Sequence, residues 1–172
     1  MKNLRKTLLA TALIGAVTFG ALGTAYADSL KDTAIFDQAS ITAQQAMDQA
    51  KSKFDGKVIE VELKHKKDNL YYEVKLLKES ETQEFKIDAK TGDVLGSKSE
   101  QKAEQAEKRQ RLQQEVKISL TQAMDIAQQQ TGGKIKEIEF KVKKDRPQYQ
   151  IKMIVNGKIE ELRLDANTGE RF

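Results

Sequence analysis

The chain has 172 residues, and its 30 basic and 26 acidic residues give a formal net charge of +4. Three of the basic residues, Lys2, Arg5 and Lys6, stand at the N-terminus before an apolar stretch. The sequence after that stretch holds 27 basic against 26 acidic residues, a net charge of only +1, so we expect no nucleic-acid partner. The sequence contains no cysteine, which excludes disulfide bonds and thiolate chemistry.

The N-terminus has the pattern of a secretory signal peptide. Its basic residues precede an apolar run that reaches the small residues Ala25 and Ala27, and polar sequence begins at Asp28. An uncleaved membrane anchor is the alternative, but glycines and threonines dilute the apolar run. Without cysteine, no lipid-modified cysteine can follow the signal. We therefore expect a secreted or extracytoplasmic protein, in the periplasm or cell wall space, with no membrane span after cleavage.

Cleavage of this signal is a testable prediction. The exported protein should begin at Asp28, because Ala25 and Ala27 meet the small-residue requirement of the cleavage site. Intact-mass spectrometry of protein recovered outside the inner membrane will measure this. A mass that still includes residues 1–27 would mean a membrane-anchored protein instead.

An internal repeat with an offset of 77 residues organises the rest of the chain. Residues 41–95 align with residues 118–172 without a gap, so that "ITAQQAMDQA" falls on "ISLTQAMDIA". A tail, residues 28–40, precedes the first unit. Residues 96–117 lie between the units and are rich in Gln, Glu, Lys and Ala, which predicts a solvated linker that could be helical.

Each unit is predicted to begin with a helix. Alanine and methionine recur at helical spacing and form one narrow face of small residues. Gly56 and Gly133 are expected to end the two helices. The helix starts carry capping boxes, Thr42-x-x-Gln45 and Ser119-x-x-Gln122.

Period-two alternation after each helix predicts an antiparallel meander of strands. In the second unit, Asn156-Gly157 indicates a two-residue hairpin, and the same register pairs apolar residues in both units. The fold class is therefore α+β, with two repeated units that each pack one helix on a short antiparallel sheet. The predicted pairs are Tyr72 with Ile87, Val74 with Phe85, Tyr149 with Leu164, and Ile151 with Leu162.

A repeated acidic hexapeptide, "DAKTGD" at 88–93 and "DANTGE" at 165–170, follows the third strand of each unit. We interpret both copies as turns with a left-handed glycine, which should place Ile87 opposite Leu95 and Leu164 opposite Phe172. A calcium or acid–base site is the alternative, but one turn offers too few converging oxygens for a calcium cage. The predicted turn residues are Asp88, Thr91, Gly92, Asp165, Thr168 and Gly169.

The order of these features resembles the PepSY domain. Both units have a helix with spaced alanines, a Gly-x-hydrophobic start of a strand, a Tyr-x-hydrophobic strand and a final "DAxTG[DE]" turn. The resemblance implies an exported protein, because PepSY domains occur in the propeptides of thermolysin-like metallopeptidases, where they are linked to inhibition, and in envelope proteins. It brings no catalytic residues. This sequence has no His-Glu-x-x-His motif, so the resemblance implies that any protease target is a separate molecule.

Other candidate chemistry is weak. His65 is the single histidine, and Val142 replaces it in the second unit, which favours a strand-end residue over a metal ligand or a general base. Tyr71, replaced by Gln148, is predicted to face outward as a minor contact residue. Repeated lysines alternate with glutamates and favour a solvated face over an anion site. These lysines are Lys64, Lys66, Lys67, Lys141, Lys143 and Lys144.

We therefore expect no catalytic, cofactor-binding or metal-binding residues, and no cofactor. The leading hypothesis is an exported, non-enzymatic protein that binds another protein through its sheets, as an inhibitor or regulator of a secreted or envelope protease. The alternative is an envelope-associated structural or adhesion protein, whose basic clusters contact anionic wall polymers weakly.

Overall fold

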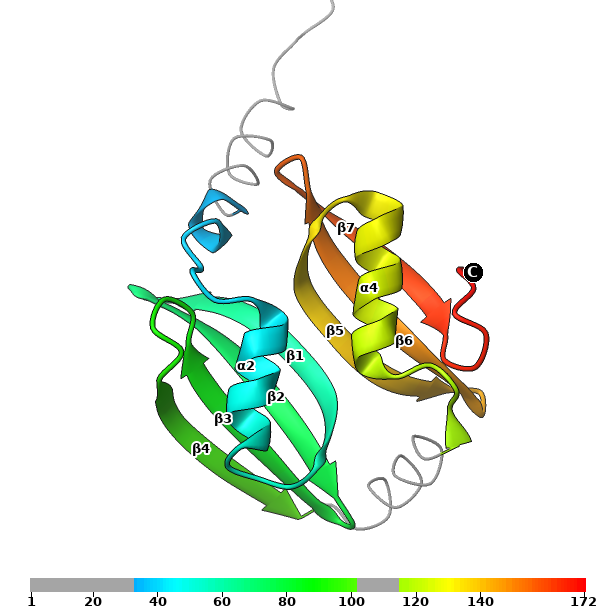
Figure 1. The fold of residues 1–172 in the computed structure, drawn as a ribbon, viewed down its shortest axis with the longest axis horizontal. Coiled ribbons are helices and arrows are strands. Elements are labelled where there is room, and N and C mark those ends of the chain that lie inside the picture. Colours follow the sequence, from blue (N-terminus) through cyan, green and yellow to red (C-terminus); the bar gives the residue numbers. More distant parts are fainter. Residues whose placement is uncertain (1–32, 102–114) are drawn as a thin grey trace, which may run out of the picture.

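The computed structural model describes residues 33–101 and 115–172, and the predicted cleavage residues Ala25, Ala27 and Asp28 lie outside these ranges. The described residues form one sheet of seven strands in the order β4-β3-β2-β1-β5-β6-β7, with both helices on one face (Figure 1). Unit 1 contains α2 (Ala43–Lys51), β1 (Lys57–Lys66), β2 (Asn69–Lys78), β3 (Glu81–Asp88) and β4 (Val94–Gln101). Unit 2 contains α4 (Leu120–Thr131), β5 (Lys134–Lys143), β6 (Arg146–Val155) and β7 (Lys158–Asp165).

The two units join through their first strands. β1 pairs antiparallel with β5, and Val61 lies opposite Ile138, which occupies the same position in the other repeat. The helices also meet at equivalent positions, where the Thr121 hydroxyl donates a 3.2 Å hydrogen bond to the side chain of Gln44. Contacts between equivalent residues indicate a pseudo-twofold axis between the units. The predicted α+β fold is confirmed, and the sheets of the two units join into one continuous sheet.

The helices pack on the sheet through the predicted small residues. Alanine and methionine side chains of α2 and α4 are buried, so each helix lies close to the strands beneath it. Both capping boxes are present, with the hydroxyl and the glutamine side chain each accepting a backbone N–H. The buried helix residues are Ala43, Ala46, Met47 and Ala50 in α2, and Leu120, Ala123, Met124 and Ala127 in α4.

The predicted helix ends are wrong. Ser52 is the C-cap of α2, and Gly132 caps α4 in the left-handed conformation with φ of 69°. Gly132 precedes Gly133 and already supplies the conformation that ends a helix, so the chain is free to extend from Gly133 into β5. Gly56 likewise stands just before β1.

The predicted pairing of the second and third strands of each unit is confirmed. Asn156 and Gly157 both have positive φ, 49° and 72°, as a two-residue type I′ hairpin requires. All four predicted pairs are present, namely Tyr72 with Ile87, Val74 with Phe85, Tyr149 with Leu164, and Ile151 with Leu162.

The predicted register of the last hairpin is wrong by one residue. Ile87 lies opposite Val94 rather than Leu95, and a bulge separates this pair from the rest of β4. Leu95 is 55% exposed, so it adds nothing to the core. Unit 2 repeats the shift, because Leu164 forms its bridge with Arg171.

The cause of this shift is the alanine of the hexapeptide. Ala89 is fully buried and donates its N–H to the carbonyl of Leu70, so it does not pair across the hairpin with Asp93. The closing pair becomes Asp88 and Asp93, whose N–H and carbonyl lie 2.8 Å apart. In unit 2, Asp165 donates to Glu170 in the same way, and Phe172 is left 63% exposed.

Unit 1 also extends further along the chain than the repeat indicated. β4 runs to Gln101 and pairs along β3, so residues 96–101 of the predicted linker form a strand. Residues 96–101 have small or polar side chains. An edge strand can be held by main-chain hydrogen bonds to its one neighbour, and polar side chains suit its exposed side. Residues 102–114, the middle of the predicted linker, lie outside the described ranges.

Candidate functional site

The repeated hexapeptides form hydrogen-bonded turns. The Asp88 carboxylate accepts the N–H groups of Lys90 and Thr91 at 2.7 and 2.9 Å, and the Thr91 hydroxyl donates to Asp93 at 2.7 Å. The N–H groups of Thr91 and Lys90 lower the pKa of Asp88, because they stabilise its charged form. The carboxylate oxygens thus form hydrogen bonds within the turn itself. The same bonds recur among Asp165, Asn167, Thr168 and Glu170.

These turns also hold the start of each helix. The carbonyl of Ala89 accepts the N–H groups of Ser40 and Ile41 at 2.8 and 3.1 Å, and the Tyr72 hydroxyl donates to the Ile41 carbonyl at 3.1 Å. Burial raises the pKa of Tyr72 to about 12, so its hydroxyl remains a donor at any physiological pH. In unit 2 the corresponding residues are Ala166, Ile118 and Tyr149. The sequence shows tyrosine and alanine only as core residues, so this link between turn and helix was not predicted.

The glycines of the turns provide a matched pair of variants. Gly92 and Gly169 have φ of 83° and 74°, a conformation that a β-branched residue resists. Gly92→Val and Gly169→Val should therefore each lower the free energy of unfolding by about 1 kcal/mol or more. We expect the larger loss at Gly169, where an added Cβ would lie 3.0 Å from Cδ1 of Ile126, whereas at Gly92 the nearest atom is 3.8 Å away.

Thermal melts of the two valine variants will measure this, with Asp88→Asn as the control. The control should be much milder, because an amide oxygen can still accept the two N–H bonds of the turn. Unchanged stability in both valine variants would contradict the structural role of the turns.

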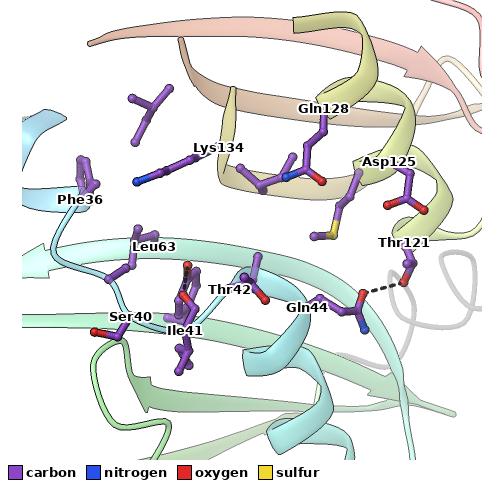
Figure 2. Close-up of a pocket in the computed structure, with 16 residues that line it drawn as sticks. Phe36, Ser40, Ile41, Thr42, Gln44, Leu63, Thr121, Asp125, Gln128 and Lys134 are labelled. Carbon is purple, nitrogen blue, oxygen red and sulfur yellow. Dashed lines mark hydrogen bonds between the residues drawn. The ribbon is translucent and has the colours of Figure 1, made fainter. Parts of the chain in front are cut away.

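A cavity of about 420 Å³ lies between the two helices above the junction of β1 and β5 (Figure 2). Leu63 from β1 and Met124 from α4 line it, and Lys134 and Asp125 bring charge to it. A second cavity of about 400 Å³ contains equivalent residues of the opposite units, and Thr121 lines both. The pseudo-twofold axis explains the pair, because the contact of Thr121 with Gln44 lies between the two cavities and both residues line the first of them. We interpret both cavities as packing gaps of the junction.

Part of the predicted N-terminal tail bridges the two units. Residues 33–36 form a helical turn that leads into α2 of unit 1 and also contacts unit 2. This segment therefore adds contacts to a junction in which only three residues of β1 pair with β5. The contacts of this turn and of Asp37, which follows it, are Thr33 to the Gly157 carbonyl (3.0 Å), Asp37 to Lys134 (2.7 Å), and Lys136 over the ring of Phe36 (5.3 Å).

The sheet face opposite the helices carries a network of ion pairs across the junction. Glu73 and Glu137 are only 7% and 8% exposed, and each binds a lysine of a neighbouring strand. Three carboxylates, Glu60, Glu62 and Glu73, lie close enough together to hold a cation. Lysines already form ion pairs with all three carboxylates, so we assign no metal site. The pairs are Lys64 with Glu73 (2.6 Å), Lys75 with Glu60 (2.9 Å), Lys136 with Glu62 (3.3 Å) and Lys152 with Glu137 (2.7 Å).

The network shifts the pKa values of its members in opposite directions. Burial raises the pKa of Glu60 and outweighs its bond to Lys75. Burial acts on Glu62 in the same sense, but the hydrogen bond and charge of Lys64 outweigh it and lower the pKa. The pKa of Lys64 is raised, because its bonds to Glu73 and Glu62 exceed the cost of burial. Lys64 is thus a half-buried cross-strand partner of carboxylates rather than part of a solvated face.

Among the remaining predicted residues, His65, Lys66 and Tyr71 line a cavity of about 450 Å³ together with Lys64. His65 is exposed near the end of β1, and Lys66 and Lys67 are exposed beside it. The prediction of an exposed Tyr71 is wrong, because its side chain is only 8% exposed. Lys86 lies over its ring, with Nζ 5.7 Å from the centroid, and covers it.

Two strands form the edges of the sheet, β4 in unit 1 and β7 in unit 2 (Figure 1). Edge strands present main-chain N–H and carbonyl groups that can pair with another chain. The large apolar residues that are exposed in the described chain lie in these two strands or follow them. They are Val94 and Leu95 in β4, Ile159 in β7, and Phe172 after β7. The sheet edges, rather than a pocket with converging polar groups, are therefore the candidate functional site.

Comparison with known proteins identifies the family to which this chain belongs. The family model "Peptidase propeptide and YPEB domain", PepSY, matches residues 40–98 and 117–170. The chain therefore belongs to the PepSY family, as its resemblance implied, and carries two such domains. No curated protein matches the chain.

A solved structure described as a "putative lipoprotein", from Clostridium difficile 630, is similar with 23% sequence identity and a TM-score of 0.49. The match covers 77% of this chain and 90% of that one. In the part of the chain that the structure describes, no helix has the length and apolar character needed to cross a membrane.

Proposed function

We propose that this protein is an exported, non-enzymatic binding protein and that it inhibits or regulates a secreted or envelope protease. One observation carries the proposal, namely a continuous seven-strand sheet whose two edge strands expose apolar side chains. Proteases bind their substrates in extended form, and an edge strand offers an extended chain or accepts one. Such binding inhibits without any catalytic residue of the inhibitor.

The continuity of the sheet supports a single rigid binding body. A unit of roughly 55 residues without disulfides buries a small core and offers a small interface. The β1–β5 pairing merges two such cores, and the ion pairs of Lys136 with Glu62 and of Lys134 with Asp37 connect the halves. We therefore expect full-length protein to bind its target better than either unit alone.

The experiment is capture followed by inhibition. Protein comprising residues 28–172 is used as bait in the secreted and envelope fractions of the source organism, and captured proteins are identified by mass spectrometry. Metallopeptidases from the same fractions are then assayed with and without the protein in trans. Dose-dependent inhibition of a captured protease supports the proposal, and no inhibition by folded protein refutes it.

Binding of wall polymers is the second candidate function. Lys66, Lys67, Lys143 and Lys144 are all exposed, and the antiparallel β1–β5 pairing places the two clusters at opposite ends of the junction. Two separated basic ends suit the bridging of polyanions better than the binding of one small anion. Capture of wall fragments without a protease, released by about 0.5 M salt because surface charges are then screened, would favour this candidate.

A further inference from the structure

We propose that the outer edge of β7, from Ile159 to Leu162, binds an extended segment of the partner protein as an eighth, antiparallel strand. The inference rests on the proposed function and deepens it by assigning the edge, the register and the chemistry of the bound segment. β6 covers one side of β7. On the other side, the structure has the bridge between Leu164 and Arg171 and the bonds beside it.

The main-chain groups that would bind the new strand follow from those bonds. The N–H of Phe172 donates to the carbonyl of Arg163 at 3.3 Å, and the N–H of Asp165 donates to Glu170 at 2.9 Å, both on the outer side of β7. In an antiparallel strand the N–H and carbonyl of one residue point to the same side, and the side alternates along the strand. Ile159 and Glu161 therefore direct their N–H and carbonyl groups outward.

Unit 1 shows how a strand fills this position. There β4 covers β3, and the first pair, Ile87 with Val94, is the equivalent of Leu164 with Arg171. Arg171 thus stands where β4 begins, and the stretch of β7 beyond it matches the stretch of β3 that residues 96–101 cover. The repeat supplies the register of the proposed strand without any assumption about the partner.

The same comparison predicts the side chains of the bound segment. In unit 1 the small residue Ser97 lies opposite Phe85, and Lys98 lies opposite Glu84. Leu162 and Glu161 hold these two positions in unit 2, so the segment should place a small residue and then a basic residue there. Two residues later it should place an apolar residue, because Ile159, 46% exposed, replaces Thr82 of unit 1.

The other edge of the sheet is less suited to such binding. β4 carries a bulge near Gly96, and its exposed side chains beyond the bulge are Ser97, Lys98 and Ser99. Lys98 and Glu100 form an ion pair along the strand. Bulges and charged side chains discourage strand addition, and natural sheets use them to protect edges. The exposed apolar residues of β4, Val94 and Leu95, lie at its start, on the turn side of the bulge, whereas Ile159 lies within the uncovered stretch of β7.

The test supplies the proposed eighth strand within the protein itself. The sequence of residues 96–101, carrying Glu100→Val, is appended after Phe172, where β4 follows Leu95 in unit 1. Amide hydrogen exchange should then slow at Ile159 and Glu161 by about tenfold or more, because these N–H groups gain partners. The same extension with Glu161→Pro, which removes the outward N–H but leaves the β6 pairing intact, should show no added protection at Ile159.

Partner binding provides the second measurement. The extension should weaken inhibition of the captured protease about tenfold or more by occupying the edge. Glu161→Pro without the extension should weaken it to a similar degree. The control Glu161→Thr keeps the N–H and removes only the carboxylate that faces the basic residue of the segment, so it should weaken inhibition much less, because an exposed ion pair contributes little to binding. Ile159→Lys provides a variant that weakens binding without a proline.

The two measurements separate the two proposals. Slower exchange in a protein that inhibits no protease would support the edge and refute the protease role. Unchanged exchange at both residues in the extended protein would overturn the edge proposal. Full inhibition by both the extended protein and folded Ile159→Lys would overturn it as well and leave the protease role standing.

Discussion

Ile138→Asp should lower the free energy of unfolding by about 3–5 kcal/mol, because it places a carboxylate without a partner in a fully buried site. Ile138 is 0% exposed and lies opposite Val61, also 0% exposed, on the pseudo-twofold axis. The loss should therefore affect both units. Ile138→Val is the matched control, and it should cost only about 0.5–1.5 kcal/mol because it removes one methylene group.

Denaturant unfolding followed at probes in each unit will measure this loss. A continuous sheet predicts one transition in the wild type, and in the Asp variant a lower midpoint for both probes. If unit 1 kept its own midpoint while unit 2 lost stability, the two units would be folding independently, and the β1–β5 junction would contribute little to stability.

The internal repeat is the reason that so much of the fold could be predicted. Two different sequences at the same offset had to satisfy one register, and only one register buried Val74 with Phe85 and Ile151 with Leu162. The capping boxes were also predictable, since they depend on residues three positions apart in the chain. Local signals and repeated signals were thus sufficient for the helices and the first three strands of each unit, but not for the helix ends or for β4.

The junction between the units could not be predicted in the same way. β1 and β5 alternate between apolar and charged residues, a pattern that suits any antiparallel neighbour. Glu60 and Glu62 lie opposite Glu139 and Glu137, so the charges of the paired residues argued against this pairing rather than for it. Lysines of neighbouring strands, including Lys75 on β2, resolve the repulsion only once the sheet is assembled.

The candidate edge was only partly predictable for a related reason. A meander of short strands leaves an open edge, but the sequence did not show which strand would remain uncovered. Residues 96–101 lack an apolar pattern, so the sequence favoured a linker where the structure has β4. The inward position of Ala89 was also not evident, because the tyrosine and helix start that it joins are distant in the chain.

The second large effect is expected at the glycine that precedes β5. An added Cβ at Gly133 would lie 2.7 Å from the main-chain carbonyl oxygen of Ile154, in the neighbouring strand β6. A main-chain atom held in a ladder cannot move away without disturbing its pairing. Gly133→Ala should therefore lower the free energy of unfolding by about 1–3 kcal/mol, the usual cost of overpacking.

Gly56, the equivalent glycine of unit 1, is the matched control. A Cβ there would also come within 2.7 Å of a neighbour, but that atom belongs to the ring of Phe54, a half-buried side chain. Because the ring can rotate away, Gly56→Ala should change stability by less than about 1 kcal/mol, and the lost flexibility of the unfolded chain offsets part of that. Thermal melts of both variants will compare them. Equal losses at the two glycines would mean that the strand start at Gly133 adjusts as freely as a side chain, and that β5 is held less firmly against β6 than its nine paired residues indicate.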